Sequence, residues 1–298
     1  MSTITIMGAT GQVGSKTVNN LLGKGHTLRL IARHADKLQQ FAGKGGVEIH
    51  TGDSLNSDFL AGVIKGCNVV MLMMPADYHS ENIGAYQDKL GTAQIEAIKK
   101  SGVKKVLFLS SVGGHTEDHT GIVAGLARQE VRLNQLENVD VLILRPTYFM
   151  ENLFGNIGII KSMGINGSPL KPDKKFPIIA TQDIAKVAAE KLDALNWTGK
   201  SVLPLLGPKD YDMAEVNKAL ASAIGKPELQ YIQFPYDQAK QGLVQQMGLS
   251  ASTAESFIEM IDGINSGVFN LEKRNSESTT PTTIEEFSEI FAHVYNLN

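Results

Sequence analysis

The stretch Thr3-Ile4-Thr5-Ile6-Met7-Gly8-Ala9-Thr10-Gly11-Gln12-Val13-Gly14 decides the fold of this chain. A β-branched run leads into Gly-x-x-Gly-x-x-Gly, and an amphipathic segment follows, which predicts a strand, a tight turn and the start of a helix. The glycines let a diphosphate approach the backbone because no Cβ blocks it, and the helix N-terminus offers free N–H groups. The stretch therefore predicts a dinucleotide-binding turn with contacts from Gly8, Thr10, Gly11, Gln12 and Val13.

Strand-like and helix-like segments alternate through the first two-thirds of the chain. Several strand candidates are apolar almost throughout, as expected for strands buried on both faces of a sheet. The strand candidates are residues 3–7, 27–33, 47–51, 69–73, 104–110, 140–144 and 202–206. Strict alternation after a glycine-rich first turn predicts an α/β fold, a doubly wound parallel sheet of the Rossmann type with right-handed crossovers.

The alternating pattern loosens near residue 150. We predict a dinucleotide-binding Rossmann domain over residues 1–150 and a smaller C-terminal α/β lobe over residues 151–298, which carries the substrate and interleaves with the first part. A clear helix with Asp183 near its N-terminus is followed by a strand, so residues 180–206 are expected to return to the Rossmann domain. The last predicted helix starts at Ile284.

Composition excludes several classes of protein. The chain has 298 residues and a net charge of -3, without a run of Lys or Arg, so no nucleic-acid surface is expected. No apolar run is long enough to cross a bilayer, and no signal-peptide pattern precedes the first strand. Cys67 is the only cysteine, which excludes an intrachain disulfide and favours a cytoplasmic protein. We expect no metal site.

The end of the second strand indicates which dinucleotide binds. A free ribose 2′-hydroxyl calls for Asp or Glu there, but this chain has Arg33, and Lys37 lies one helical turn further on. An arginine can bind a 2′-phosphate through two hydrogen bonds, so the pattern favours NADP(H) over NAD(H). Asp36 conflicts with this reading, and we expect it to cap the short helix that follows.

Other strand ends supply further candidates for ligand binding. Met73, Met74 and Pro75 follow the fourth strand and are expected to border the cofactor. Asp53 follows the third strand, where it could accept a hydrogen bond from the adenine amino group or cap the helix at 57–65. Ser111 follows the fifth strand, where it could orient a substrate carbonyl or satisfy the backbone of the turn.

These motifs together resemble one known group of proteins. The glycine-rich turn, the Arg33 strand end, Gly52-Asp53, Ser110-Ser111 and Arg145-Pro146-Thr147-Tyr148-Phe149-Met150-Glu151-Asn152-Leu153 are similar to the NmrA-like group of atypical short-chain dehydrogenases/reductases. Asp183-Ile184-Ala185 and Thr280-Pro281 add to the likeness, which covers nearly the whole chain. The resemblance implies that this chain is either an NADPH-dependent reductase of quinones or dyes, or a regulator that binds the dinucleotide without known chemistry.

Active short-chain reductases use a Tyr-x-x-x-Lys pair on the helix after the fifth strand, and this chain lacks it there. Residues 119–131 contain neither Tyr nor Lys, and of the residues that relatives keep on this helix only Glu130 is retained. The match Tyr236-x-x-x-Lys240 lies in the smaller lobe, so we interpret it as chance. Tyr148 follows the sixth strand, where it could wall the nicotinamide ring or simply pack between the lobes.

Three functions are consistent with these observations. The favoured one is an NADPH-dependent reductase that transfers hydride directly to a small conjugated acceptor, quinone-like or dye-like, with the second proton supplied by solvent. A soft apolar wall would suit such an aromatic substrate, unless its members are plain core: Met71, Met73, Met74, Phe149, Met150 and Phe154. The alternatives are a non-catalytic NADP(H)-binding redox sensor with a partner protein, and a nucleotide-sugar epimerase.

Overall fold

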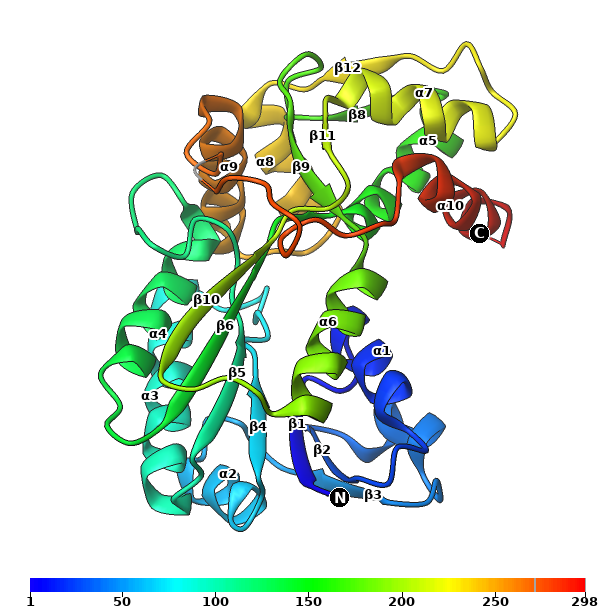
Figure 1. The fold of residues 1–298 in the computed structure, drawn as a ribbon. Helices are drawn as coiled ribbons and strands as arrows, with labels where there is room; N and C mark the ends of the chain where they lie inside the picture. The colour runs from blue at the N-terminus through cyan, green and yellow to red at the C-terminus, as the bar shows by residue number, and fades with distance from the viewer. Residues whose placement is uncertain (271, 298) are drawn as a thin grey trace.

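The computed structural model describes residues 1–270 and 272–297, which form a larger and a smaller lobe (Figure 1). The larger lobe is built on a seven-stranded parallel sheet with the order β10-β6-β5-β4-β1-β2-β3. Its strands are β1 (Thr3–Met7), β2 (Thr27–Ala32), β3 (Val47–Thr51), β4 (Val69–Leu72), β5 (Lys105–Leu109), β6 (Asp140–Pro146) and β10 (Lys200–Leu205). Every predicted strand of this sheet is present, and the predicted Rossmann-type fold is confirmed.

Helices cover both faces of this sheet, which explains why its strands are apolar on both sides. On one face α1 (Gln12–Leu21) packs against α6 (Thr181–Ala194), and on the other lie α2 (Ser57–Ile64), α3 (Ile83–Ser101) and α4 (Ala124–Asn134) (Figure 1). Alternate residues of one strand face opposite helix layers. In β4, Val69 and Met71 join the core under α1 and α6, whereas Val70 and Leu72 join the core under the other helices.

The strand order reverses between β1 and β4, which lie side by side in the middle of the sheet. In open parallel sheets a ligand binds outside the carboxyl ends of the strands at this point. The glycine-rich turn leaves the carboxyl end of β1, and the carboxyl ends of the strands face the smaller lobe (Figure 1). The fold therefore places the predicted nucleotide site between the two lobes.

The smaller lobe contains elements that the sequence did not resolve. It has a three-stranded sheet, β11-β9-β7, and a two-stranded sheet, β12-β8. Their bounds are β7 (Tyr148–Phe149), β8 (Asn166–Ser168), β9 (Phe176–Ile179), β11 (Asp210–Tyr211) and β12 (Tyr231–Gln233). These strands have two to four residues each, which is too short for a repeating apolar pattern to predict them reliably. The helices around them are α5 (Ile157–Met163), α7 (Met213–Ala223), α8 (Tyr236–Gln245), α9 (Ala251–Ser266) and α10 (Ile284–Leu297).

The chain enters the smaller lobe after β6, returns to the larger one for α6 and β10, and leaves again. Strand β10 pairs in parallel with β6, and helix α6 packs on α1. The exact domain boundary near residue 150 stays a prediction. Among the described residues, no helix has both the length and the apolar character needed to cross a membrane.

The segment that precedes α10 forms hydrogen bonds with residues at the junction between the two lobes. The Ser278 carbonyl accepts a hydrogen bond from the backbone of Leu206, and the buried Asp183 carboxylate accepts from the Thr282 backbone N–H at 2.9 Å and its hydroxyl at 2.8 Å. Asp183 is the third residue of α6, and the residue in the cap position is Ala180. Asp183 therefore anchors the C-terminal segment, which is a long-range contact that the helix pattern alone could not reveal.

We predict that Thr282→Val lowers the free energy of unfolding by about 1–3 kcal/mol, because it leaves an oxygen of a buried carboxylate without its donor. Urea unfolding followed by circular dichroism measures this change. Thr279→Val is the matched control, since Thr279 is exposed and its hydroxyl bonds only to the local Asn275 carbonyl. Equal stability losses in the two variants would contradict the anchoring role of Asp183.

Candidate functional site

The three glycines of the first turn differ in what a side chain at each position would contact. Gly8 has a φ of +72°, which a residue with a side chain rarely adopts, and a Cβ on it would lie 1.9 Å from the Met73 sulfur. A Cβ on Gly14 would lie 2.1 Å from the Gly8 carbonyl oxygen, so Gly14 lets α1 pack directly on the turn. Gly11 is exposed, and its Cβ would meet only the Gly8 oxygen at 3.4 Å.

The start of α1 is open to a ligand. Gly11 is the N-cap residue, and no side chain accepts a hydrogen bond from the first turn of this helix. Thr10 and Gln12 are exposed beside it, whereas Val13 is buried and holds the turn against the core. Free N–H groups and the positive end of the helix dipole are what a diphosphate requires. The residues at this turn therefore fit a dinucleotide.

Arg33 stands at the end of β2 with its charge available. It is exposed and forms no salt bridge with any residue in the described part of the chain. Burial raises the pKa of the nearby Tyr86, the Arg33 guanidinium lowers it, and Asp77 and Asp53 raise it again. Arg33 thus lies among groups that border the nucleotide side of the sheet. Asp36 is not the cap that we predicted, because His34 occupies the N-cap position of the short helix over Ala35–Phe41.

Asp53 is not the helix cap either. The cap of α2 is Asn56, whose side chain accepts hydrogen bonds from the backbone N–H groups of Asp58 and Phe59. One Asp53 oxygen accepts from the Leu55 N–H at 2.9 Å within the turn, and the residue is exposed. Of the two roles predicted for Asp53, only the contact with adenine remains as a proposal.

The segment after β4 forms a wall beside the glycine-rich turn. The Met73 sulfur fills the space that a side chain on Gly8 would need, and Met73, Met74 and Pro75 are all half-buried. The side-chain amide of the buried Gln94 donates a hydrogen bond of 2.8 Å to the Met73 carbonyl oxygen. Helix α3 therefore holds this wall in place through Gln94, a role that the sequence pattern did not reveal.

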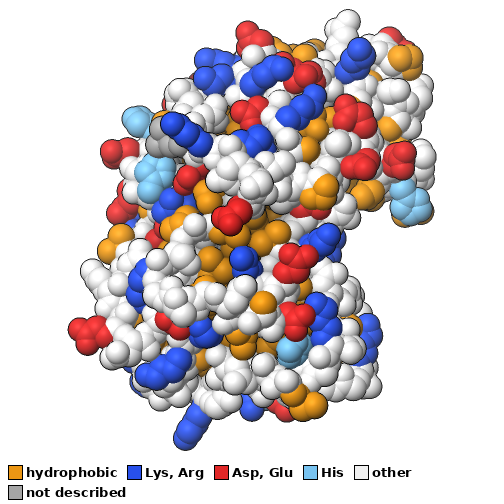
Figure 2. Space-filling model, in the orientation of Figure 1, with side chains coloured by type: hydrophobic (Ala, Val, Ile, Leu, Met, Phe, Trp, Pro, Cys, Tyr) orange, Lys and Arg blue, Asp and Glu red, His pale blue; other side chains and the backbone are white. Residues whose placement is uncertain are grey.

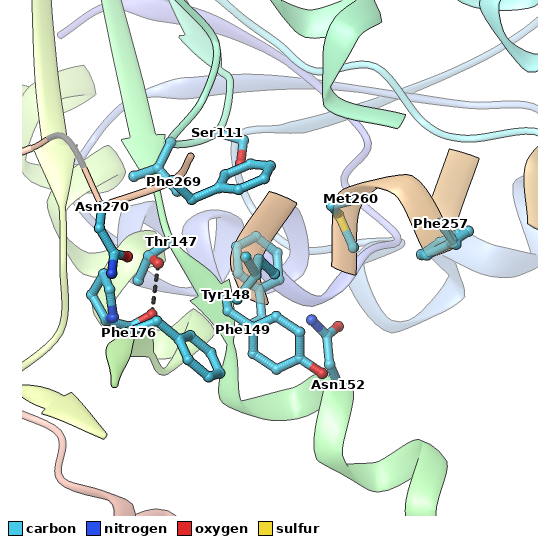
Figure 3. A pocket seen from close by; sticks show the side chains of 13 residues that line it. Ser111, Thr147, Tyr148, Phe149, Asn152, Phe176, Phe257, Met260, Phe269 and Asn270 are labelled. Carbon is cyan, nitrogen blue, oxygen red and sulfur yellow. Dashed lines mark hydrogen bonds between the residues drawn. The ribbon is translucent and has the colours of Figure 1, made fainter. Parts of the chain in front are cut away.

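An apolar cavity of about 180 Å³ lies between the lobes, at the carboxyl ends of β5 and β6 (Figure 3). Hydrophobic side chains also gather near the middle of the molecular face between the lobes (Figure 2). The residues that line the cavity come from the segments after β5 and β6, from β7, η3 (Met150–Asn156), β9 and α9, and from the segment after α9: Ser111, Val112, Thr147, Tyr148, Phe149, Asn152, Phe176, Pro177, Phe257, Met260, Ile264, Phe269 and Asn270. Phe149 and Met73 are both partly buried against the hydrophobic core under α1 and α6.

Two of the predicted catalytic candidates, Ser111 and Tyr148, line this cavity. The Tyr148 ring packs edge-on against Phe176 at 5.8 Å between ring centres, and its hydroxyl lies beside the Asn152 amide (Figure 3). Burial raises the pKa of Tyr148 to about 12, although the interaction with Asn152 opposes this shift. The hydroxyl is therefore a neutral hydrogen-bond donor at physiological pH, unlike a tyrosine whose pKa a lysine lowers.

Glu130 does not line the cavity. Its buried carboxylate accepts hydrogen bonds from the Arg145 guanidinium at 3.0 and 2.6 Å and from the Ser110 hydroxyl at 2.5 Å. A third Arg145 contact, at 3.2 Å, goes to Glu272. Both Glu130 oxygens are thus occupied in fixing the ends of β5 and β6, which favours a structural role over the catalytic one that we considered.

Three of the six residues considered for the methionine and aromatic wall follow the alternative that the sequence left open, which is plain core. Met71 and Met150 are fully buried core residues, and Phe154 packs against Phe287 and Phe291 of α10. Of the proposed wall, only Phe149 lines the cavity.

The sequence analysis missed the contribution of α9. Phe257, Met260 and Ile264 follow the i, i+3, i+7 spacing of one helix face and close the far side of the cavity. That stripe was visible in the sequence, but nothing indicated which lobe it faced. Tyr236 and Lys240 bond to Asp262 and Glu255 of the same helix, so the chance Tyr-x-x-x-Lys match fastens α8 to α9.

No group of three or more His, Cys, Asp or Glu side chains that could hold a metal ion occurs within residues 1–270 and 272–297.

The chain matches the NmrA-like family over residues 1–288 and belongs to that family. It is 26% identical over 257 residues to the NAD(P)H azoreductase of Xenophilus azovorans. This match covers 86% of this chain and 85% of the azoreductase.

Solved structures with the same fold include reductases and a regulator. The NADPH-dependent quinone oxidoreductase of Escherichia coli, complexed with NADPH, has a TM-score of 0.79 at 20% identity and covers 96% of this chain and 99% of its own. The Citrobacter sp. triphenylmethane reductase has a TM-score of 0.79 at 19% identity. The match covers 98% of this chain and 99% of the reductase chain. NmrA, a negative transcriptional regulator in complex with NADP, has a TM-score of 0.66 at 12% identity. The match covers 97% of this chain and 90% of the NmrA chain. The predicted cofactor, NADP(H), is present in the quinone oxidoreductase and NmrA complexes, and the azoreductase is named for NAD(P)H.

We predict that Arg33→Asp weakens NADPH binding about tenfold to a hundredfold, because it removes a charge-assisted contact to the 2′-phosphate and adds repulsion. NADH binding should change far less. Titration calorimetry with both cofactors measures the two dissociation constants. Lys65→Asp, an exposed change of the same charge just before β4, is the control. Equal losses for NADPH and NADH in Arg33→Asp would contradict its assignment as the phosphate-binding residue.

The glycine geometry predicts that two alanine substitutions separate folding from binding. Gly14→Ala brings a methyl group into the Gly8 carbonyl and should cost about 1–3 kcal/mol of stability. Gly11→Ala has room in the protein, so it should unfold almost as the parent does, yet bind NADPH at least tenfold more weakly because the methyl group occupies the diphosphate path. Thermal unfolding and calorimetry check both variants. Normal NADPH binding by Gly11→Ala would show that the cofactor does not pass over this turn.

Proposed function

We propose that this protein is an NADPH-dependent reductase that passes hydride directly to a small conjugated acceptor, quinone-like or dye-like. The proposal rests on the apolar cavity at the carboxyl ends of β5 and β6, the edge of the sheet at which a Rossmann-bound cofactor lies. The azoreductase and the two reductase structures support the reaction class.

The chain's own residues hold the two partners and exclude water. The turn over Gly8–Gly14 would bind the diphosphate, Arg33 the 2′-phosphate, and the Met73 wall one side of the nicotinamide arm, while NADPH supplies the hydride. Phe149, Met260 and Phe269 offer apolar surface for a flat acceptor. Among the described residues, no Asp, Glu, His, Lys or Arg lines the cavity, so the second proton comes from solvent. Catalysis then rests mainly on proximity and orientation.

A redox sensor is the second candidate. Helix α4 and the short helix before it, Gly121–Val123, carry neither Tyr nor Lys, and the NmrA regulator bound to NADP shares the fold. A sensor must bind NADP⁺ and NADPH with different affinities and pass the difference to a partner protein. An epimerase needs a base beside its sugar, and the uncharged cavity lining disfavours that reaction.

We predict that the purified protein oxidises NADPH, monitored at 340 nm, in the presence of at least one acceptor from a panel of quinones, azo dyes and triphenylmethane dyes. NADH should support a slower rate because it lacks the phosphate that Arg33 binds. The Gly11→Ala variant provides the control for reaction outside the site. No turnover above background with any acceptor, together with intact NADPH binding, would overturn the reductase and favour the sensor.

A further inference from the structure

The polar groups of the cavity are few, and they differ in what they can still bind. The Thr147 hydroxyl donates to the Pro177 carbonyl at 2.7 Å, and the Asn270 amide donates to the Lys175 carbonyl at 3.2 Å. These two groups are committed to the protein. Tyr148 and Asn152 contact each other within the cavity lining, and the Ser111 side chain has no bond to another described residue.

The lining as a whole carries no formal charge. Its side chains are apolar, hydroxyl or amide groups, and no carboxylate faces the space. The buried Glu130 carboxylate and the half-buried Glu272 carboxylate both pair with Arg145, and both lie outside the lining. A cation transferred from water into such a space loses hydration without gaining a counter-ion, which is strongly unfavourable.

We propose, on the basis of the reductase function above, that this cavity selects compact, uncharged acceptors with a carbonyl oxygen, such as quinones, over cationic dyes, and that the Tyr148 hydroxyl donates the hydrogen bond that binds this oxygen. The cavity of about 180 Å³ is smaller than the 300 Å³ or more of sites for drug-sized ligands. It therefore suits one or two fused rings better than the three separate rings of a triphenylmethane dye.

The donor also fits the chemistry of the step. A quinone takes a hydride, which carries two electrons and one proton, from NADPH and a second proton from solvent, which yields hydroquinone and NADP⁺. Negative charge grows on the carbonyl oxygen as the hydride arrives, and a fixed donor in a water-poor site stabilises that charge. Tyr148 keeps its proton throughout, since burial raises its pKa to about 12. It acts as a hydrogen-bond donor, and the net proton comes from water.

The test compares kcat/KM of the full-length protein and of Tyr148→Phe with 1,4-naphthoquinone and with crystal violet, a cationic triphenylmethane dye, at saturating NADPH. We expect the parent to prefer the quinone, and Tyr148→Phe to lose about tenfold or more with the quinone while its rate with the dye stays unchanged. The quinone loss should be the same at pH 6 and pH 9, because Tyr148 does not titrate in that range. Asn152→Ala should shift the same ratio in the same direction by a smaller factor.

Tyr295→Phe is the matched control, since Tyr295 belongs to the core around α10 and does not line the cavity. Unchanged melting temperature and NADPH affinity in Tyr148→Phe show that the variant is folded. A parent enzyme that prefers the cationic dye, or a Tyr148→Phe variant that loses both acceptors equally or neither, overturns the inference while leaving the reductase function in place. Absence of turnover with both acceptors overturns the reductase function itself.

Discussion

The packing of α1 directly on the glycine-rich turn is the contact on which the rest of the site depends. The Gly8 carbonyl touches α1 where a side chain on Gly14 would lie, and the Met73 sulfur occupies the opposite side of Gly8. Three elements thus meet at one residue: β1, α1 and the segment after β4. Their close approach fixes the open N-terminus of α1 at the carboxyl end of β1, at the end of the sheet that faces the smaller lobe (Figure 1).

The segment from Arg145 to Asn152 connects this nucleotide side to the smaller lobe. Arg145 pairs with Glu130 under the strand ends, and the Glu151 carboxylate accepts from the Thr181 backbone at the start of α6 and from Lys16 of α1 at 3.1 Å. Between these two anchors the chain presents Tyr148 to the cavity. One short stretch therefore stabilises the lobe junction and also supplies its ligand-facing groups, which is why it is the most distinctive motif of the sequence.

The sequence predicted the large sheet well because buried parallel strands leave continuous apolar runs and the first turn needs its glycines. The candidate nucleotide-binding residues could be proposed from the sequence because they lie within a few positions of the predicted strand ends, and their contacts with a cofactor stay predictions. The remaining features depend on long-range contacts. Glu130 could not be recognised as a partner of Arg145, nor Asp183 as a partner of Thr282, 99 positions away. The cavity face of α9 has the same spacing as a core face, so only the packing of the lobes distinguishes them.

The proposed function depends on hydride transfer from bound NADPH to an acceptor held in the cavity. Single-turnover absorbance at 340 nm, with the protein in excess over NADPH, follows this step when 1,4-naphthoquinone is added by rapid mixing. Enzyme-bound NADPH should be oxidised much faster than free NADPH, and deuterium at the transferred position of the nicotinamide should slow that step. Oxidation of the bound cofactor at or below the rate in free solution would contradict the proposed function.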